Sequence, residues 1–238
     1  MSDIWNPWHG CRRYSDGCRN CYVYRRDESI GVDASKVRKT AAFDLPVRRK
    51  RGGGYSVPPQ SALFLCMTSD FFIEEADEWR GDIWRMIRLR RDVFFTVITK
   101  RIARLPACLP PDWGGGWDNF RLICTMENQR EADNRLPLLL DAPIKHKGIA
   151  CEPLLSPVRF NPPLDDRIEI VVAGGESGVN ARPCRYEWIL DIREQCKNAG
   201  VSFWFKQTGA NFIKDGREYK IPRRLQHEQA KKANINLD

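Results

Sequence analysis

The sequence predicts a parallel α/β fold in which the strands form a partial (β/α) barrel. Six short apolar runs recur along the 238 residues. They are continuous rather than alternating, which is typical of strands buried on both faces of a parallel sheet. Segments with helical spacing lie between them, and alternating strands and helices favour right-handed crossovers. In such a barrel the carboxyl ends of the strands meet at one face, where active sites are built.

The expected strands begin near the N-terminus, where residues 4–7 form a short first strand. The later strands are the apolar runs at 62–67, 94–98, 121–125, 148–151, 168–173 and 201–205. Helices are expected between them at 75–91, 128–140 and 186–199. Gly200 is a natural stop for the last of these helices, whereas Pro137 makes the middle one less regular.

Composition and segment boundaries suggest one domain over residues 1–212, followed by a polar surface tail with a short helix over residues 213–238. A chain with 42% hydrophobic and 29% charged residues is globular. No apolar run approaches the about 20 residues of a membrane span, and the N-terminus lacks the basic-then-apolar layout of a signal peptide. We therefore expect a soluble, cytoplasmic protein.

The net charge of +8 is concentrated in one part of the chain. Residues 12–51, the basic segment, hold 12 basic and five acidic side chains. A focused positive field attracts polyanions, so a nucleic acid or nucleotide is the expected partner. The alternative is a basic surface that is merely solvated.

Each expected strand delivers polar or glycine residues at its carboxyl end. These are, in chain order, Ser69 and Asp70, Lys100 and Arg101, Glu127 and Asn128, Glu152, Gly174-Gly175-Glu176, and Lys206. Acids and bases directly beside apolar runs favour an enzyme over a scaffold. Glu127 and Glu152 could orient hydroxyl groups or act as general bases. An internal network of salt bridges is the structural alternative.

The nine cysteines include a cluster near the N-terminus. Cys11, Cys18 and Cys21 follow a C-x6-C-x2-C spacing, and two thiolates two residues apart can point at one metal centre. A [4Fe–4S] cluster on these three cysteines is one interpretation. Zinc with His9 as fourth ligand is another, and purely structural cysteines are a third. The remaining six cysteines are scattered, and those in apolar runs are expected to be small buried side chains.

The sequence resembles a known family along most of its length. The matching stretches are WNPWHGC (5–11), SDGCRNCY (15–22), MTSDFF (67–72), TVITKR (96–101), ENQREADNRLPLL (127–139), CEPLL (151–155), GGESG (174–178), ARP (181–183) and FKQTG (205–209). They are similar to the phage-type three-cysteine-motif proteins, which are mostly of unassigned function. That family in turn resembles the radical S-adenosylmethionine superfamily, a variant of the TIM barrel.

The resemblance implies a [4Fe–4S] cluster held by Cys11, Cys18 and Cys21. Its open iron would bind S-adenosylmethionine, and reductive cleavage would give a 5′-deoxyadenosyl radical that abstracts hydrogen from a substrate. The first gap between cysteines is longer here than the superfamily's C-x3-C-x2-C. Asn20 also stands where an aromatic residue usually precedes the last cysteine.

The resemblance also assigns cofactor-binding residues by their position in the barrel. Ser69 and Asp70 end the second strand and would bind the methionyl amine. Gly174 and Gly175 would let the backbone approach the adenosine, and Glu176 would face the substrate or cofactor.

The remaining strand-end residues are assigned to the same face. Lys100, Arg101 and Lys206 would meet a cofactor carboxylate or a substrate phosphate, and Asn128 is placed with the cofactor. Glu127, Glu152 and Lys206 are the candidate catalytic residues.

Three functions follow. The leading hypothesis is a radical S-adenosylmethionine-like iron–sulfur enzyme that modifies a nucleic acid or nucleotide. The second is a zinc-stabilised nucleic-acid-binding protein without radical chemistry. The third is a barrel hydrolase or transferase without a metal, using Glu127 and Glu152.

Overall fold

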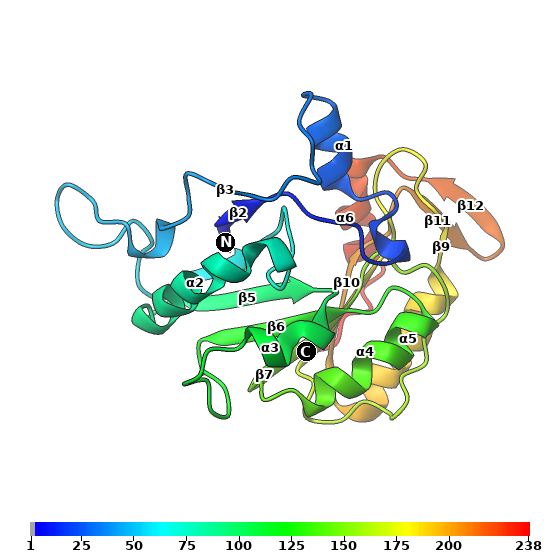
Figure 1. The fold of residues 1–238 in the computed structure, drawn as a ribbon. Coiled ribbons are helices and arrows are strands. Elements are labelled where there is room, and N and C mark those ends of the chain that lie inside the picture. The colour runs from blue at the N-terminus through cyan, green and yellow to red at the C-terminus, as the bar shows by residue number, and fades with distance from the viewer. Residues whose placement is uncertain (1–2) are drawn as a thin grey trace. The chain divides into compact units, whose positions relative to one another are not determined.

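The computed structural model describes residues 3–238 and has a mixed α/β fold (Figure 1). Its strands are β1 (Asp3–Trp5), β2 (Trp8–His9), β3 (Arg38–Lys39), β4 (Ala62–Leu65), β5 (Phe94–Thr99), β6 (Phe120–Thr125), β7 (His146–Cys151), β8 (Ile170–Gly174), β9 (Cys184–Arg185), β10 (Ser202–Gln207), β11 (Asn211–Lys214) and β12 (Arg217–Lys220). Its α-helices are α1 (Tyr22–Glu28), α2 (Asp77–Leu89), α3 (Leu105–Cys108), α4 (Gln129–Asp141), α5 (Tyr186–Ala199) and α6 (Arg223–Lys232).

The main sheet has seven strands in the order β1-β4-β5-β6-β7-β8-β10. The pairs β1–β4, β4–β5, β7–β8 and β8–β10 are parallel. The order has two ends, β1 and β10, so the described strands do not close into a ring. The prediction of an α/β fold with parallel strands is confirmed, and each predicted strand and helix has its counterpart in the structure.

The chain divides into two compact units. Unit 1 comprises the residues up to Arg13, Val23–Ile123 and Ala142–His146, and unit 2 comprises Tyr14–Tyr22, Cys124–Asp141 and Lys147–Asp238. The segment with the three motif cysteines is therefore shared between them: Cys11 belongs to unit 1, whereas Cys18 and Cys21 belong to unit 2.

Unit 1 is built around aromatic side chains that α2 packs beside the strands. Trp84 of α2 lies with its ring centroid 4.9 Å from that of Phe71 and 5.2 Å from those of Trp113 and Phe120. All four side chains are buried. Because aromatic side chains bury large apolar areas, this cluster contributes to the core together with the buried Ile83 and Ile87 of α2.

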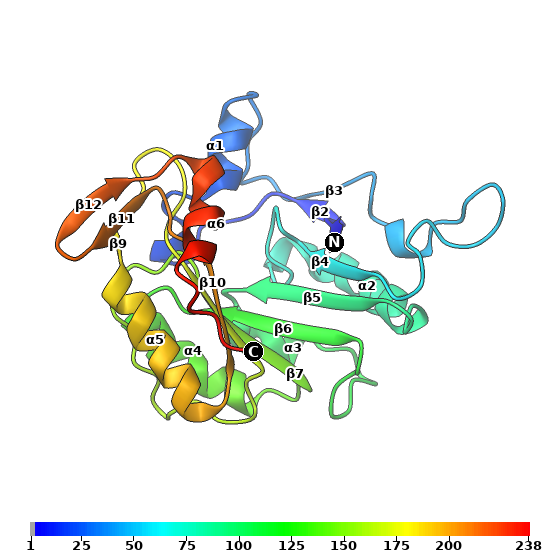
Figure 2. The same cartoon turned by 180° about the vertical axis from the view of Figure 1, so that it is seen from behind.

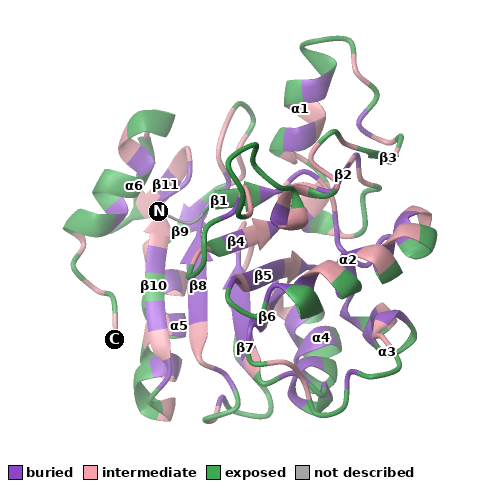
Figure 3. Cartoon of the chain, turned by 90° about the vertical axis from the view of Figure 1, so that its left-hand side faces the viewer, coloured by how far each residue is buried: buried purple, intermediate pink, exposed green. Residues whose placement is uncertain are grey.

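Unit 2 is built on β7, β8 and β10. Figure 3 shows that β7 and β8 are buried almost throughout, which explains their unbroken apolar sequences. Helix α5 buries Ile189, Ile192 and Cys196. It ends where Gly200 adopts a left-handed conformation with φ 66°, as the sequence predicts.

The C-terminal segment contains more structure than the expected polar tail with a short helix. Strands β11 and β12 form an antiparallel hairpin, and α6 follows it (Figure 2). The four residues of β12 are all exposed, so no apolar alternation marks this strand in the sequence. Leu237 exchanges two backbone hydrogen bonds of 2.9 Å with Phe203 of β10, so the chain end is part of the fold of unit 2.

Among residues 3–238, no helix has both the length and the apolar character that crossing a membrane requires.

Deletion of residues 234–238 tests whether the chain end contributes to the fold. We expect the free energy of unfolding to fall by about 3–4 kcal/mol, because four hydrogen bonds that residues 235–237 make to β10 and Arg193 are lost, each worth about 1 kcal/mol. Urea denaturation measures this, with removal of Asp238 alone as the control. Equal stability of the two truncated chains would show that residues 234–237 do not contribute to the stability of the fold.

Candidate functional site

The turn that carries Cys18 and Cys21 is a compact element of unit 2. A 3₁₀ turn spans Asp16–Cys18. The backbone N–H of Cys18 donates to the carbonyl of Ser15 at 2.9 Å, and that of Cys21 donates to the carbonyl of Cys18 at 3.3 Å. Successive tight turns therefore connect Cys18 and Cys21. We call residues 15–21 the cysteine turn.

Glu127, just after β6, holds the first half of the cysteine turn. Its carboxylate is fully buried and accepts hydrogen bonds from the hydroxyl of Ser15 and from the backbone N–H of Gly17 at 3.1 Å. Arg135 of α4 donates to the same carboxylate at 2.8 Å and supplies the opposite charge. A buried carboxylate needs such partners, since an unpaired charge is costly to remove from water.

Gly17 fits this arrangement because it has no side chain. A Cβ atom at this position would lie 2.9 Å from Oε1 of Glu127 and 3.1 Å from its carboxyl carbon. Any larger residue would push the turn off the carboxylate. The glycine inside the cysteine motif is thus explained by the close approach of the backbone to Glu127.

Glu176, just after β8, holds the second half of the cysteine turn. Its buried carboxylate accepts hydrogen bonds from Asn20 at 2.9 Å and from the backbone and guanidinium of Arg182. Arg182 also donates to the backbone carbonyl of Asp16 at 2.9 Å. Burial by itself raises the pKa of the Glu176 carboxyl, but the hydrogen bonds from Arg182 and Asn20 outweigh it, so the pKa lies below its ordinary value.

These contacts give Glu127 and Glu176 a positioning role toward the cysteines. Asn128 takes part in the same network: its amide donates to the carboxylate of Asp16 at 3.3 Å, and its oxygen accepts the backbone N–H of Glu131 at 2.9 Å at the start of α4. Asn128 thus caps the start of this helix. Its assignment to a cofactor stays a prediction.

Glu152 and Lys206, two of the predicted catalytic residues, form an ion pair. Lys206 Nζ lies 2.9 Å from Glu152 Oε2, and the two side chains are 32% and 16% exposed. The other carboxylate oxygen, Glu152 Oε1, is buried and has no hydrogen-bond partner among the described residues. Glu152 therefore keeps one carboxylate oxygen that can accept a further hydrogen bond, whereas the carboxylate of Glu176 is already bonded to Asn20 and Arg182.

The space beside Gly174 and Gly175 is occupied by the chain itself. A Cβ atom on Gly174 would lie 2.7 Å from Glu152 Oε1, and one on Gly175 would lie 2.2 Å from the carbonyl oxygen of Thr208. Both glycines are therefore required for packing against the residues at the end of β10. Their predicted approach to an adenosine is not tested by this packing.

In unit 1, Asp70 joins the ends of β4 and β5. It is buried and accepts hydrogen bonds from the Thr99 hydroxyl at 2.8 Å and from the backbone N–H groups of Phe72 at 2.9 Å and Lys100 at 3.1 Å. Arg101 lies with a guanidinium nitrogen 3.7 Å from the same carboxylate. Asp70 thus spends its acceptor capacity inside the protein, and its predicted contact with a methionyl amine stays a prediction.

Two more of the predicted cofactor residues hold the backbone on either side of Cys11. The hydroxyl of Ser69 donates to the carbonyl of Gly10, and Arg101 donates to the carbonyl of Arg12 at 3.0 Å. Gly10 has φ +97°, and a Cβ atom there would lie 2.3 Å from the carbonyl oxygen of Lys36. In both units, the predicted strand-end residues therefore fix the chain that presents the cysteines.

The three motif cysteines differ from the other six in exposure. Cys11, Cys18 and Cys21 are partly exposed, whereas the others are buried. Burial raises the pKa of the Cys66, Cys108 and Cys151 thiols, and it raises those of Cys184 and Cys196 to about 12. Since a metal binds the thiolate, the buried cysteines are poor ligands and the motif cysteines are suitable in chemistry and access.

The described part of the chain contains no ready-made group of three or more His, Cys, Asp or Glu side chains that could hold a metal ion. His9, the fourth ligand of the zinc interpretation, has its Nε2 atom 2.6 Å from the buried carboxylate of Asp27. Its other ring nitrogen is the one that a metal would use.

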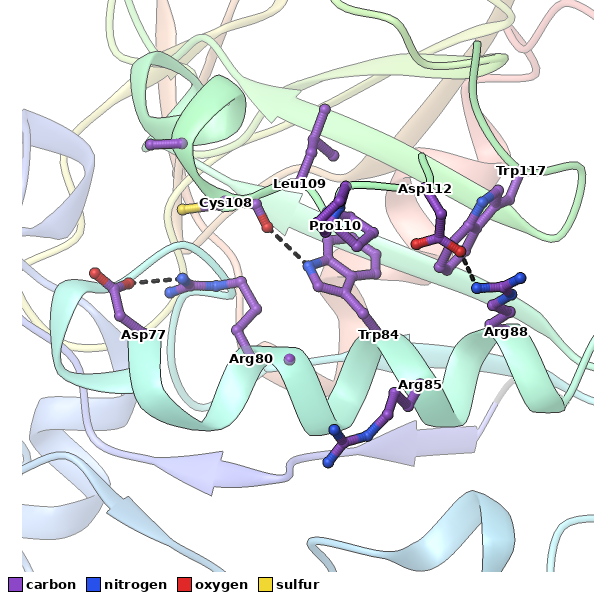
Figure 4. A pocket seen from close by; sticks show the side chains of 13 residues that line it. Asp77, Arg80, Trp84, Arg85, Arg88, Cys108, Leu109, Pro110, Asp112 and Trp117 are labelled. Carbon is purple, nitrogen blue, oxygen red and sulfur yellow. Dashed lines mark hydrogen bonds and ion pairs between the residues drawn. The ribbon is translucent and has the colours of Figure 1, made fainter. Parts of the chain in front are cut away.

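A cavity of about 410 Å³ beside α2 in unit 1 includes none of the predicted site residues (Figure 4). Its polar groups pair with one another: the indole N–H of Trp84 donates to the carbonyl of Cys108 at 2.8 Å, and Arg80 pairs with Asp77 at 2.6 Å. This cavity lies beside the aromatic cluster of unit 1. It is therefore separate from the residues that the sequence predicts to be catalytic or to bind a cofactor.

Sequence reasoning assigned no function to Ser15, Gly17, Asn20, Arg135 or Arg182. The only available signal was that small polar residues fill the gaps of the cysteine motif. Their partners are 110 residues away for Gly17 and 156 for Asn20, so no local pattern connects them.

The fold and site thus define a mixed α/β protein in which strand-end carboxylates hold a cysteine turn. The chain belongs to the family described as "Protein of unknown function (DUF5131)", whose model matches residues 1–238. No curated protein and no solved structure matches the chain.

Replacing the Glu127 carboxylate tests whether it holds the cysteine turn. In Glu127→Gln the buried Arg135 loses one of its two carboxylate partners and the first half of the turn loses a charged acceptor, so we expect Cys18 and Cys21 to react several-fold faster with iodoacetamide. Peptide mass spectrometry measures the rate at each cysteine. The matched control is Asp133→Asn, which removes an exposed carboxylate from α4; equal rates in the two variants would show that Glu127 does not hold the cysteine turn.

Glu176→Gln tests the second attachment through its pH dependence. A carboxylate with a lowered pKa in the folded state stabilises the protein above its ordinary pKa, and this stabilisation is lost as the pH falls through the lowered value. We expect the variant to be about 2 kcal/mol less stable at neutral pH. The difference should shrink as the pH drops below the ordinary value of 4.5.

Urea unfolding across this pH range measures the difference, with the exposed Glu187→Gln as control. A difference that does not change with pH would show that the charge of Glu176 contributes nothing.

Proposed function

We propose that this protein is an iron–sulfur enzyme of the radical S-adenosylmethionine type, related to the phage-type three-cysteine-motif proteins, and that it modifies a nucleic acid or nucleotide. The motif resemblance, the parallel strands and the access of the three motif cysteines support the proposal. The substrate class is supported by the basic segment of residues 12–51, which holds 12 of the 39 basic side chains.

The observation that carries the proposal is the attachment of the cysteine turn to Glu127 and Glu176. Two buried carboxylates at the ends of β6 and β8 are used to fix one short turn, and that turn presents two partly exposed thiols. A stably held pair of thiols beside strand ends is what a metal-dependent active site requires, since ligands must be pre-positioned.

Cys11, Cys18 and Cys21 would hold a [4Fe–4S] cluster. When bound with S-adenosylmethionine, such a cluster supplies a 5′-deoxyadenosyl radical for hydrogen abstraction from a substrate. Glu127, Glu176 and Arg101 act on the cysteines indirectly, by fixing the backbone that carries them.

Glu152 and Lys206 are the residues of this chain best suited to handle a proton or orient a substrate. The unpartnered Oε1 of Glu152 can accept a hydrogen bond from a substrate hydroxyl, and the Lys206 ammonium can neutralise a carboxylate or phosphate. Their mutual ion pair holds the two side chains next to each other.

A zinc-stabilised nucleic-acid-binding protein is the second candidate. The specific observation in its favour is the contact between His9 and the buried Asp27, because histidines that bind zinc commonly donate their other ring nitrogen to a carboxylate. In that case His9 would join the three motif cysteines as a ligand.

Anaerobic purification and reconstitution test both candidates. We expect about four irons and matching sulfide per chain, and formation of 5′-deoxyadenosine from S-adenosylmethionine after reduction. Cys18→Ala and Cys21→Ala should each lower the iron content and abolish cleavage, because each removes a cluster ligand.

The matched control is Cys108→Ala, which removes a buried cysteine outside the motif and should leave the iron content unchanged. One bound zinc per chain and no iron would reject the iron–sulfur enzyme and support the zinc-stabilised nucleic-acid-binding protein. Iron without cleavage would leave an iron–sulfur protein with another role.

A further inference from the structure

A second pocket of unit 1 lies outside the carboxyl ends of β1 and β4. It has a volume of about 420 Å³, within the range of small-molecule sites. Asn6, which directly follows β1, and Thr68, which follows β4, line it. Crevices outside the carboxyl ends of parallel strands are where ligands bind in open α/β sheets.

The charged wall of this pocket is mostly positive. Arg26, Arg38 and Lys39 line it, and Asp27 is the one acidic residue among its lining residues. The Asp27 side chain is 1% exposed, and its two oxygens are occupied by Arg26 at 2.9 Å and by His9 at 2.6 Å. The negative charge of Asp27 is therefore compensated by its neighbours in the pocket wall. The positive charges of Arg38 and Lys39 remain as a surplus at the pocket.

Arg38 is the cation best placed to bind a ligand. It belongs to β3, where its backbone is paired directly opposite His9 of β2 (Figure 1). Its guanidinium makes no ion pair or hydrogen bond within the described chain, whereas the Lys39 ammonium lies 4.4 Å from the ring centroid of Phe43. An arginine fork with no protein partner fits a phosphate.

The lining of the pocket also includes apolar side chains. Ile30 and Val32 line it, and the side chain of Ile30 is exposed although it is a large hydrophobic group. Thr68 adds a buried hydroxyl oxygen without a hydrogen-bond partner in the described residues. A lining that combines cations with exposed aliphatic surface suits the phosphate and the base of a nucleotide.

We propose that this pocket binds a nucleoside 5′-monophosphate, with Arg38 on the phosphate and Ile30 against the base. The ligand is either a free nucleotide or the phosphorylated end of a nucleic-acid strand, since both present the same chemistry. The inference goes beyond the proposed function and does not depend on it, because the pocket lies within unit 1 and uses none of the cysteines.

Isothermal titration calorimetry on the full-length, metal-free chain tests the proposal with AMP, adenosine and inorganic phosphate as probes. We expect AMP to bind at least tenfold more tightly than adenosine. Arg38→Ala should weaken AMP binding by about tenfold or more, as loss of a charge-assisted contact to phosphate requires. The matched control is Arg51→Ala, which removes one exposed charge of the basic segment outside the pocket and should change the affinity less than about twofold.

A second variant tests the apolar part of the lining. Ile30→Ser should weaken AMP binding by about fivefold and leave inorganic phosphate binding unchanged, because it removes apolar surface only. Ile30 is 68% exposed, so the variant keeps its fold.

Competition identifies the source of the nucleotide. Displacement of AMP by a 5′-phosphorylated but not a 5′-hydroxyl oligonucleotide would assign the pocket to a strand end, and failure of both to displace AMP would assign it to a free nucleotide. Equal binding of AMP and adenosine, or equal effects of Arg38→Ala and Arg51→Ala, would overturn the proposal. The iron content of the reconstituted protein does not depend on the AMP-binding result. The nucleotide proposal can therefore fail while the iron–sulfur proposal holds, and the reverse is also possible.

Discussion

The buried carboxylate of Glu127 is the constraint on which the cysteine turn depends. A charge in this position is tolerated only because Arg135, Ser15 and Gly17 surround it with donors. Two of those donors come from the turn itself, so each depends on the other. Without the turn the charge of Glu127 lacks two of its donors, and without the charge the first half of the turn lacks its acceptor. Glu176, with Asn20 and Arg182, repeats this arrangement after β8.

In unit 1, too, polar residues that follow the strands contact the backbone around Cys11. Asp70 collects donors from β5 and the segment after β4, while Ser69 and Arg101 hold the carbonyls of Gly10 and Arg12. In both units, some of the polar groups that follow the strands bind the chain next to a cysteine. The internal network of hydrogen bonds and salt bridges therefore includes contacts that position the backbone carrying the cysteines, whereas Glu152 Oε1 has no hydrogen-bond partner among the described residues.

The sequence was sufficient for the elements that follow from local patterns. The continuous apolar runs predicted β4, β5, β6, β7, β8 and β10, and Gly200 marked the end of α5. The hairpin of β11 and β12 was missed because β12 is exposed and carries no apolar alternation. The partners of the cysteine turn were missed because a hydrogen bond between residues more than 100 positions apart leaves no periodic signal. The glycine pair after β8 was assigned to a ligand, and the close approach of Glu152 to Gly174 and of Thr208 to Gly175 gives a packing reason for both glycines.

The long sequence separations in the cysteine turn impose an order on the maturation of the protein. The cysteines are synthesised first, at the N-terminus, whereas Glu127, Glu176 and Arg182 follow them by more than 100 residues. Translation proceeds at about 5–20 residues per second, so the thiols emerge many seconds before any group that can fix them. During that interval they are reactive side chains on an unstructured segment. The cysteine turn can therefore take its final position only after β8 has joined the sheet, so folding of the N-terminal motif waits for the C-terminal half of the chain.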